Sequence, residues 1–352
     1  MLTRRKLLQI AGASGALAAT SYSGLRSAGA QSRPFTFCSF GGALSQTEKT
    51  AFMDPAGQKF GVQIAHASPT NYAKIKAMVE AKAVEWDLVD VGGQFIFQGR
   101  DQDLLEKMDF SIIDTSKLDK AWVTDYGVFT STGATVIAYS TKAFQGRTPS
   151  SWKDFWDVKN FPGARSLYSR FYYNYEAAVL AAGLRRDEVY PATDEKVKIA
   201  FDKLRELKPH VKVWWTAGAQ PPQLLASGEV TMASAWSGRV LDIMKENAPV
   251  AFTYKDAVAW GNAFIVPKGT PYRDLAMKII NYSITEEAQL RLLPLGTYGP
   301  ALASAAAKAT PEQEKLYVSH PSNIKDACIF SDEEVAKYVT KYEDEWKKFQ
   351  LA

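Results

Sequence analysis

Residues 33–42, RPFTFCSFGG, and residues 86–93, WDLVDVGG, are two short apolar segments that each end in a pair of glycines. Between them, residues 46–60 and 72–83 have the apolar spacing of helices, and residues 62–64 form another short apolar segment. An order of strand, helix, strand, helix, strand is typical of parallel βαβ units, so the sequence predicts an α/β fold. In such sheets ligands bind beyond the carboxyl ends of the strands. The glycine pairs stand at two of these ends, where the backbone can approach a ligand closely; a tight turn is the alternative for each pair.

The rest of the chain continues this alternation. Further strands are predicted at residues 134–140, 166–168, 231–236 and 259–267, and helices at residues 151–158, 195–208, 239–246, 272–293 and 332–349. Two stretches of α/β pattern flank the strands near residues 136 and 263, which suggests two lobes with two chain crossings between them. We predict that lobe 1 contains residues 31–136 and 265–305, and lobe 2 residues 137–264 and 306–352.

The first thirty residues have the pattern of an export signal. Basic Arg4, Arg5 and Lys6 precede a weakly apolar stretch without acidic residues. Ala28-Gly29-Ala30 then matches the A-x-A pattern of small residues at which signal peptides are cleaved. Paired arginines are typical of the twin-arginine pathway. We therefore predict that residues 1–30 are a twin-arginine signal and that the protein acts in the periplasm. A disordered basic tail is the alternative.

The composition argues against some partners. The chain has 42 Lys and Arg against 38 Asp and Glu, but Arg4, Arg5, Lys6 and Arg26 lie in the predicted signal. The remainder is neutral, which favours neither nucleic acid nor an anionic membrane as a partner. No later segment approaches the roughly 18 unbroken apolar residues of a membrane-spanning helix. The chain is rich in aromatic residues, with nine Trp, 16 Tyr and 18 Phe; many must belong to the core, and some excess is expected if the protein holds a small organic solute between rings.

No motif for catalysis or for a metal is present in the sequence. The three histidines, His66, His210 and His320, stand apart from one another, and no zinc, nucleophile or phosphate-binding pattern occurs. The two cysteines, Cys38 and Cys328, either form a disulfide or remain buried thiols. We therefore predict a binding protein without a cofactor or metal, and not an enzyme.

Several segments together resemble the periplasmic solute-binding proteins of ABC importers, in the spermidine/putrescine-type branch. They are SFGGA (39–43), EWDLVDV (85–91), GATVIAYS (133–140), TPSSW (148–152), FPG (161–163), WTAGAQPPQLLASGEV (215–230), IVPKG (265–269) and YGP (298–300). This resemblance implies a two-lobed, hinged α/β fold of the type II binding-protein kind. It also implies a monomer that closes on a small solute and then docks on a membrane permease.

The resemblance also implies a site. In polyamine binders of this branch, aromatic rings enclose the alkyl chain and carboxylates hold the ammonium ends. Phe40, Trp236 and Trp260 stand at ring positions, with core packing as the alternative for each tryptophan, whereas the family's acids fall on Arg170, Tyr173 and Asn262. An arginine favours a carboxylate ligand through bidentate hydrogen bonds, although Arg170 could instead form a surface ion pair. The other candidate site residues are Gly41, Gly42, Gly92, Gly93, Gln94, Gln220 and Tyr298.

The leading hypothesis is therefore a periplasmic binding protein for a small organic solute, with a carboxylate as one feature of the ligand. A polyamine is the main alternative. Ferric-ion binding through Tyr172 and Tyr173, and an exported enzyme on the same fold, are less favoured. Arg239, which opens a predicted helix, is interpreted as structural.

Overall fold

The computed structural model describes residues 33–144, 146–296 and 298–351. The chain divides into two compact units, residues 1–34 and 35–352, and the fold described below is that of the second unit. The predicted export signal at residues 1–30 lies outside the described residues. Within them, no helix has the length and apolar character that crossing a membrane requires.

The strands of the described residues form one mixed sheet. Its main path runs β2-β1-β3-β9-β5-β8-β6-β7, while β4 and β10 pair with β5, and β11 pairs with β9. The strands are β1 (Phe35–Cys38), β2 (Ile64–Ala67), β3 (Leu88–Gly92), β4 (Val123–Thr124), β5 (Gly127–Ser140), β6 (Arg165–Tyr168), β7 (Val211–Trp215), β8 (Met232–Trp236), β9 (Val250–Ile265), β10 (Gly299–Pro300) and β11 (Cys328–Ile329).

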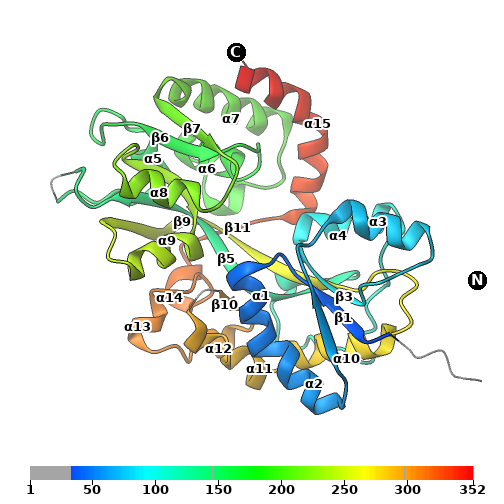
Figure 1. The fold of residues 1–352 in the computed structure, drawn as a ribbon. Helices are drawn as coiled ribbons and strands as arrows, with labels where there is room; N and C mark the ends of the chain where they lie inside the picture. The colour runs from blue at the N-terminus through cyan, green and yellow to red at the C-terminus, as the bar shows by residue number, and fades with distance from the viewer. Residues whose placement is uncertain (1–32, 145, 297, 352) are drawn as a thin grey trace, which may run out of the picture. The chain divides into compact units, whose positions relative to one another are not determined.

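Helices cover both ends of this sheet (Figure 1). They are α1 (Gly42–Glu48), α2 (Asp54–Phe60), α3 (Tyr72–Glu80), α4 (Gly93–Asp101), α5 (Trp152–Trp156), α6 (Asn174–Ala182), α7 (Asp194–Leu207), α8 (Gln220–Ala226), α9 (Ser237–Lys245), α10 (Arg273–Ser283), α11 (Glu286–Leu290), α12 (Ala303–Ala306), α13 (Pro311–Glu314), α14 (Pro321–Ile324) and α15 (Asp332–Leu351). A π-helical turn, Lys49–Met53, joins α1 to α2.

The parallel units predicted from residues 33–93 are confirmed, and the other end of the sheet contains parallel strands as well. β1 pairs in parallel with β2 and β3, and β6 pairs in parallel with β7 and β8. Local signals begin and end the helices as the sequence suggests. The Asn71 side chain accepts a hydrogen bond from the backbone N–H of Lys74 and caps α3, and Gly61 ends α2 in the left-handed conformation with φ of 65°.

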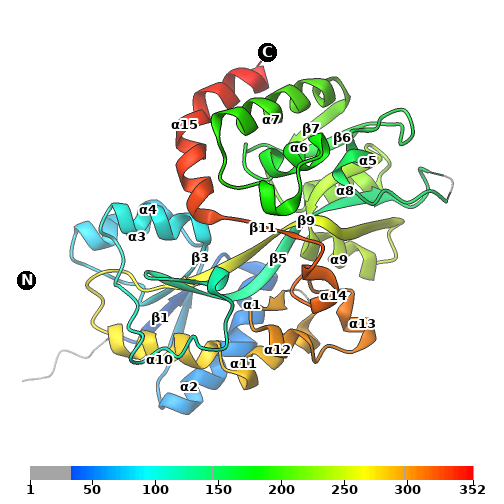
Figure 2. The ribbon, with the colours of Figure 1, turned by 180° about the vertical axis from the view of Figure 1, so that it is seen from behind.

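The long antiparallel strands β5 and β9 connect the two ends. They contain 14 and 16 residues, and their register shifts between Thr135 and Ile137. Figures 1 and 2 show both strands running from the helices around α7 to those around α10, with β11 beside β9. The sequence analysis found only the apolar half of each strand, because their other halves carry glycine, threonine, lysine and aspartate.

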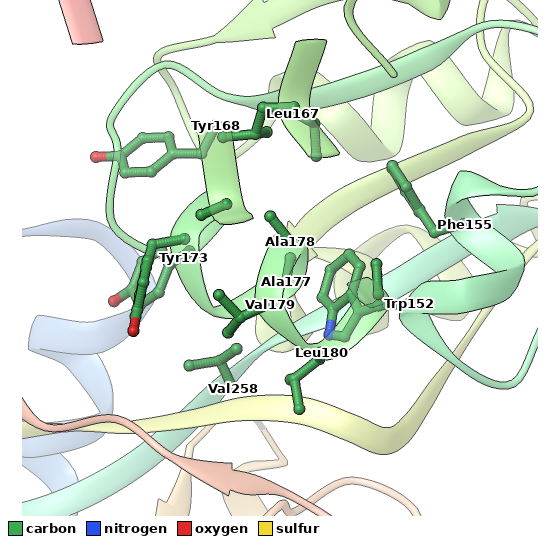
Figure 3. Packing of buried hydrophobic residues seen from close by; sticks show 14 of the residues in the cluster. Trp152, Phe155, Leu167, Tyr168, Tyr173, Ala177, Ala178, Val179, Leu180 and Val258 are labelled. Atoms are coloured by element: carbon green, nitrogen blue, oxygen red, sulfur yellow. The ribbon is translucent and has the colours of Figure 1, made fainter. Parts of the chain in front are cut away.

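Buried hydrophobic side chains form four clusters rather than one core. Two clusters, around Phe52 and around Ile75, flank the β2-β1-β3 end, and two more, around Phe201 and around Val240, flank the β8-β6-β7 end. In the largest cluster, Tyr168 and Tyr173 lie at the margin and direct their hydroxyls away from Trp152 and Leu180 (Figure 3). The sheet therefore carries separately packed ends that are joined by long strands.

Two details differ from, or complete, the sequence interpretation. The single helix predicted over residues 272–293 is wrong, since α10 ends at Ser283 and Thr285 caps a new helix by accepting a hydrogen bond from the backbone N–H of Ala288. Cys38 and Cys328 are both buried and unpaired. Of the two alternatives, a disulfide or two buried thiols, the structure therefore has the thiols. Burial raises the pKa of the Cys38 thiol to about 11, so this thiol stays protonated at neutral pH.

Candidate functional site

A cavity of about 300 Å³ lies where β5 and β9 meet the strand ends on either side. Its walls come from segments that are far apart in the sequence. They are Phe40, Gly41, Leu44, Tyr72, Gly92, Gly93, Gln94, Tyr168, Tyr172, Tyr173, Trp236, Arg239, Trp260, Gly261, Asn262, Tyr298 and Asp332. We call this space the central cavity. Its volume suits a small organic molecule.

Most residues of the predicted site lie together in this cavity. Those that line it are Phe40, Gly41, Gly92, Gly93, Gln94, Tyr173, Trp236, Trp260, Asn262 and Tyr298. The three others lie elsewhere. Gly42 is the first residue of α1, Arg170 lines a neighbouring cavity, and the Gln220 side chain accepts hydrogen bonds from the backbone N–H groups of Thr216 and Ala217 at 2.9 and 3.2 Å. Gln220 thus caps its own turn rather than offering its amide to a ligand.

The sequence analysis missed seven lining residues. Arg239 was interpreted as structural, and Tyr172 was considered only for iron. The others missed are Leu44, Tyr72, Tyr168, Gly261 and Asp332. Asp332 stands at the first position of the last helix, where an acidic residue is an ordinary helix-start signal, so its sequence context gave no reason to place it in a site.

Asp332 is a buried carboxyl group in the wall of the central cavity. Only 9% of the residue is exposed, and a Cβ atom added at Gly93 would lie 2.1 Å from its Oδ2, so the carboxyl group packs directly on the start of α4. Burial raises the pKa of Asp332 well above its ordinary value, although a hydrogen bond from the backbone N–H of Gln94 opposes this shift. A cation brought into the cavity would stabilise the ionised form.

Arg239 supplies a positive charge to the same cavity. It lies in the first turn of α9, and its side chain is 41% exposed. Its nearest carboxylate is that of Asp242, at 3.9 Å from Nη1, which is a long and weak ion pair. The guanidinium can therefore rotate to form a bidentate contact with an anionic group of a ligand.

Aromatic rings form the apolar walls between these charges. Tyr168 lies 6.0 Å from Trp236, and Trp236 lies 6.4 Å from Trp260, measured between ring centroids. The Nε1 group of Trp260 donates to Thr135 Oγ1 at 3.3 Å, whereas the buried Nε1 of Trp236 has no hydrogen-bond partner in the described part of the chain. These rings contribute apolar surface, and Trp236 retains a free donor.

Tyr173 has a backbone conformation that is unusual for a residue with a side chain. Its φ is 68°, and its N–H donates to the buried Glu176 carboxylate at 2.6 Å. Glu176 also accepts from the hydroxyls of Tyr190 and Tyr338, each at 2.7 Å. Such strain persists only where neighbours fix it, and it is frequent at functional sites.

The phenol of Tyr298 is affected by the charge of Arg239 and by those of two buried acids, Asp90 and Glu48. Burial raises the pKa of Tyr298 to about 12; Arg239 acts against this shift, and Asp90 and Glu48 add to it. Burial also raises the pKa values of Tyr172 and Tyr173. Both phenols therefore stay neutral near neutral pH in the metal-free protein. Among the described residues, no three His, Cys, Asp or Glu side chains could hold a metal ion together.

The arrangement is suited to binding a molecule with two opposite charges. The cavity offers a guanidinium, a buried carboxyl group and aromatic walls between them. The described lining holds no nucleophile paired with a base, and the geometry supports recognition by charge and shape.

Comparisons with known proteins agree with this geometry. The model of the bacterial extracellular solute-binding protein family matches residues 51–318. A gamma-aminobutyric acid-binding protein from Pseudomonas aeruginosa is 35% identical over 303 residues, which are 85% of each chain. The spermidine/putrescine-binding periplasmic protein of Escherichia coli is 21% identical over 81% of this chain and 80% of its own.

A solved structure extends the similarity to the whole fold. An ABC transporter substrate-binding protein from Bradyrhizobium japonicum matches with a TM-score of 0.84 and 36% identity, over 90% of this chain and 98% of its own. The predicted resemblance and fold class are thereby confirmed. The chain belongs to the bacterial extracellular solute-binding proteins and serves an ABC transporter as its substrate-binding component.

Proposed function

We propose that this protein captures a small zwitterionic ω-amino acid of the γ-aminobutyric acid class. The observation that carries the proposal is the presence of Arg239 and Asp332, one cation and one buried carboxyl group, in a single cavity with aromatic walls. The name of the P. aeruginosa relative, a gamma-aminobutyric acid-binding protein, supports the same ligand class.

Each end of the ligand has a complementary group. The guanidinium of Arg239 binds the carboxylate of the ligand, and the carboxylate of Asp332 binds the ammonium group of the ligand. Burial favours a proton on Asp332 in the free protein, and the ammonium group takes the place of this proton. Trp236, Trp260 and Tyr173 enclose the short alkyl chain. Phe40, Asn262 and the backbone of Gly92 complete the enclosure.

Capture involves closure of two lobes around the ligand. We place lobe 1 at residues 31–136 and 265–305 and lobe 2 at residues 137–264 and 306–352, with β5 and β9 acting as the hinge. The separately packed clusters at the two ends of the sheet support this division. The ligand favours the closed form because only there do both lobes contact it.

The remaining features follow from the same proposal. Residues 1–30 direct export through the twin-arginine pathway, and the mature protein is a periplasmic monomer that delivers its ligand, chemically unchanged, to a membrane permease. A signal-dependent periplasmic fraction and recovery of intact ligand from the purified protein test these points.

A polyamine is the second candidate. It is favoured by the buried Asp332 carboxyl group and by the aromatic walls. The positive charge of Arg239 in the same cavity opposes it, because a second ammonium group would lie near a guanidinium instead of a carboxylate.

Calorimetric titration of the mature protein separates these candidates. We expect 4-aminobutanoate to bind, and we expect butanoate and putrescine to bind at least tenfold more weakly, since each lacks one of the two charges. The Arg239→Gln variant should lose affinity for 4-aminobutanoate by about tenfold or more, whereas Asp242→Asn, which removes only the weak partner of Arg239, should retain it. Strong binding of putrescine without binding of 4-aminobutanoate would overturn the proposal.

A further inference from the structure

A second cavity, of about 510 Å³, adjoins the central cavity. It lies between α4, residues 168–172 and α15, and we call it the side chamber. Tyr72, Gln94, Tyr168 and Tyr172 line both spaces, so these four side chains stand at the junction. The hydroxyls of Tyr168 and Tyr172 are 3.2 Å apart and hydrogen-bonded to each other. The junction between the two cavities is therefore formed by the side chains of three tyrosines and one glutamine.

The side chamber contains one positive charge without a partner. Its ionisable lining residues, apart from the tyrosines, are Arg170, Glu343 and Lys347. Glu343 and Lys347 pair with each other at 3.0 Å. In the described part of the chain, no carboxylate oxygen lies within 4.0 Å of the Arg170 side-chain nitrogens. Arg170 thus leaves the chamber with a net charge of +1.

The backbone at Arg170 is held in place even though its side chain is exposed. The carbonyl of Arg170 accepts a hydrogen bond from Nδ2 of the fully buried Asn174 at 2.7 Å, and the carbonyl of the preceding Ser169 accepts from Trp346 Nε1 at 3.0 Å. A fixed backbone with a free guanidinium is suited to binding an anion, because little conformational entropy of the main chain is lost.

The side chamber opens near Asp332 and not near Arg239. Asp332 packs on Gly93, next to Gln94 at the junction, and its charge acts on the phenol of Tyr72, another junction residue. Arg239 instead acts on Tyr298, which does not line the chamber. A ligand that places its ammonium group at Asp332 therefore points that end toward the side chamber.

We propose that the side chamber binds an acid-terminated substituent on the amino nitrogen of the ligand, with Arg170 as its anion-binding residue. The inference rests on the proposed function, which places the ammonium group at Asp332. The ligand class is then ω-amino acids whose secondary ammonium nitrogen carries a carboxyalkyl chain. The nitrogen keeps N–H groups for Asp332, the methylene groups lie against Phe95 and Val339, and the second carboxylate reaches Arg170.

Two probes and two variants test this inference by calorimetric titration. The probes are 4-aminobutanoate and its N-(2-carboxyethyl) derivative, and the variants are Arg170→Gln and Lys337→Gln. We expect both probes to bind the wild type. We expect Arg170→Gln to weaken the derivative by about tenfold and to leave 4-aminobutanoate within twofold, because only the derivative carries a group for Arg170. Lys337→Gln should change neither affinity by more than about twofold, since Lys337 is an exposed residue of α15 that pairs with Glu333 and Glu334 and lines neither cavity.

Each contrary result has a distinct meaning. Binding of 4-aminobutanoate without binding of the derivative overturns the side chamber as a subsite and leaves the proposed function intact. Equal losses for both probes in Arg170→Gln, or equal effects of the two variants, likewise overturn the role of Arg170. Failure of both probes to bind the wild type overturns the proposed function together with this inference. Thermal unfolding of each variant shows that a loss of binding does not reflect a loss of folding.

Discussion

The carboxyl group of Asp332 lies so close to Gly93 that a Cβ atom at position 93 would be 2.1 Å from Asp332 Oδ2 and 2.3 Å from Cγ. This contact joins the end of β3 to the start of α15, two segments that are far apart in the sequence. It also places the acid at the N-terminus of α4, where the backbone N–H of Gln94 reaches it. Glycine at position 93 is therefore needed because a side chain there would collide with the Asp332 carboxyl group. The backbone of Gly93 does not have a positive φ, so its conformation alone does not require glycine.

Replacing Gly93 by alanine should displace the Asp332 carboxyl group. Inserting a methyl group into packed surroundings lowers the free energy of unfolding by roughly 1–3 kcal/mol, and the displaced acid should weaken 4-aminobutanoate binding by about tenfold or more. Denaturant unfolding and calorimetric titration measure the two effects. Gly99→Ala is the matched control, because it lies in the same helix and its Cβ would be crowded at 2.9 Å from the Leu105 side chain, yet Gly99 does not line the central cavity. Similar losses in the two variants would argue against the special role of Gly93.

Asp332→Asn should remove a pH dependence of ligand binding. Burial raises the pKa of Asp332, so the free protein keeps this proton well above the ordinary range of an aspartate. A bound ammonium group stabilises the carboxylate, so binding releases the proton and the affinity for 4-aminobutanoate rises as the pH increases through the raised pKa. The asparagine variant should bind at least about tenfold more weakly at pH 8 and show little change with pH.

The proton released on binding can be measured directly. Titrations in two buffers with different ionisation enthalpies should give different apparent heats for the wild type and equal heats for Asp332→Asn. Glu333→Gln is a suitable control, because Glu333 adjoins Asp332 in the sequence, pairs with Lys337 and does not line the central cavity. Equal proton release in the wild type and Asp332→Asn would show that another group titrates.

The sequence predicted the architecture better than it predicted the charges of the site. Apolar periodicity and the glycine pairs identified the parallel units, and the resemblance placed Trp236, Trp260 and Asn262, which line the central cavity. Arg170 was expected to bind the carboxylate, yet it lies in the side chamber, and Arg239 and Asp332 were not predicted. The reason is physical. A helix-start residue such as Asp332 or Arg239 has the same local sequence whether the first turn faces water or a cavity, and only long-range packing decides between them.

Glu176 should hold the Tyr173 ring in the central cavity. It accepts hydrogen bonds from the Tyr173 backbone N–H and from the hydroxyls of Tyr190 and Tyr338, all within 2.7 Å. Glu176→Gln replaces one acceptor oxygen by a donor, and one of these donors is then left unpaired, at a cost of roughly 1–3 kcal/mol. We expect a lower free energy of unfolding and weaker binding of 4-aminobutanoate.

A comparison variant separates the two effects of Glu176. Tyr190→Phe removes one donor to Glu176 without touching the Tyr173 backbone, so it should reduce stability but leave the affinity for 4-aminobutanoate within about twofold. If Tyr190→Phe and Glu176→Gln reduce affinity equally, then Glu176 acts through general stability and does not position Tyr173.

The buried acids Glu48 and Asp90 should make the protein less stable as the pH rises. Burial raises the pKa of Glu48 to about 8, with a hydrogen bond from the Ser39 hydroxyl acting against the shift, and burial and the charge of Glu48 raise the pKa of Asp90. The folded state therefore holds protons more tightly than the unfolded state. The stabilisation is complete below the ordinary glutamate pKa of 4.5 and is lost as the pH rises to about 8.

Glu48→Gln should flatten this decline, because glutamine carries no charge and Asp90 no longer faces a second acid. Denaturant unfolding between pH 5 and pH 8 should show the free energy of unfolding falling in the wild type and falling less in the variant. Taking the difference between the two proteins removes the contribution of His66, which titrates in both. Glu80→Gln is the control, since Glu80 is exposed on α3 and pairs only weakly with Lys76 at 3.8 Å. Its profile should run parallel to that of the wild type. If the free energy of unfolding of Glu48→Gln also changes with pH as in the wild type, the prediction is wrong. In that case Glu48 and Asp90 ionise in the folded protein at no cost in stability, because polar groups such as Ser39 compensate for their burial.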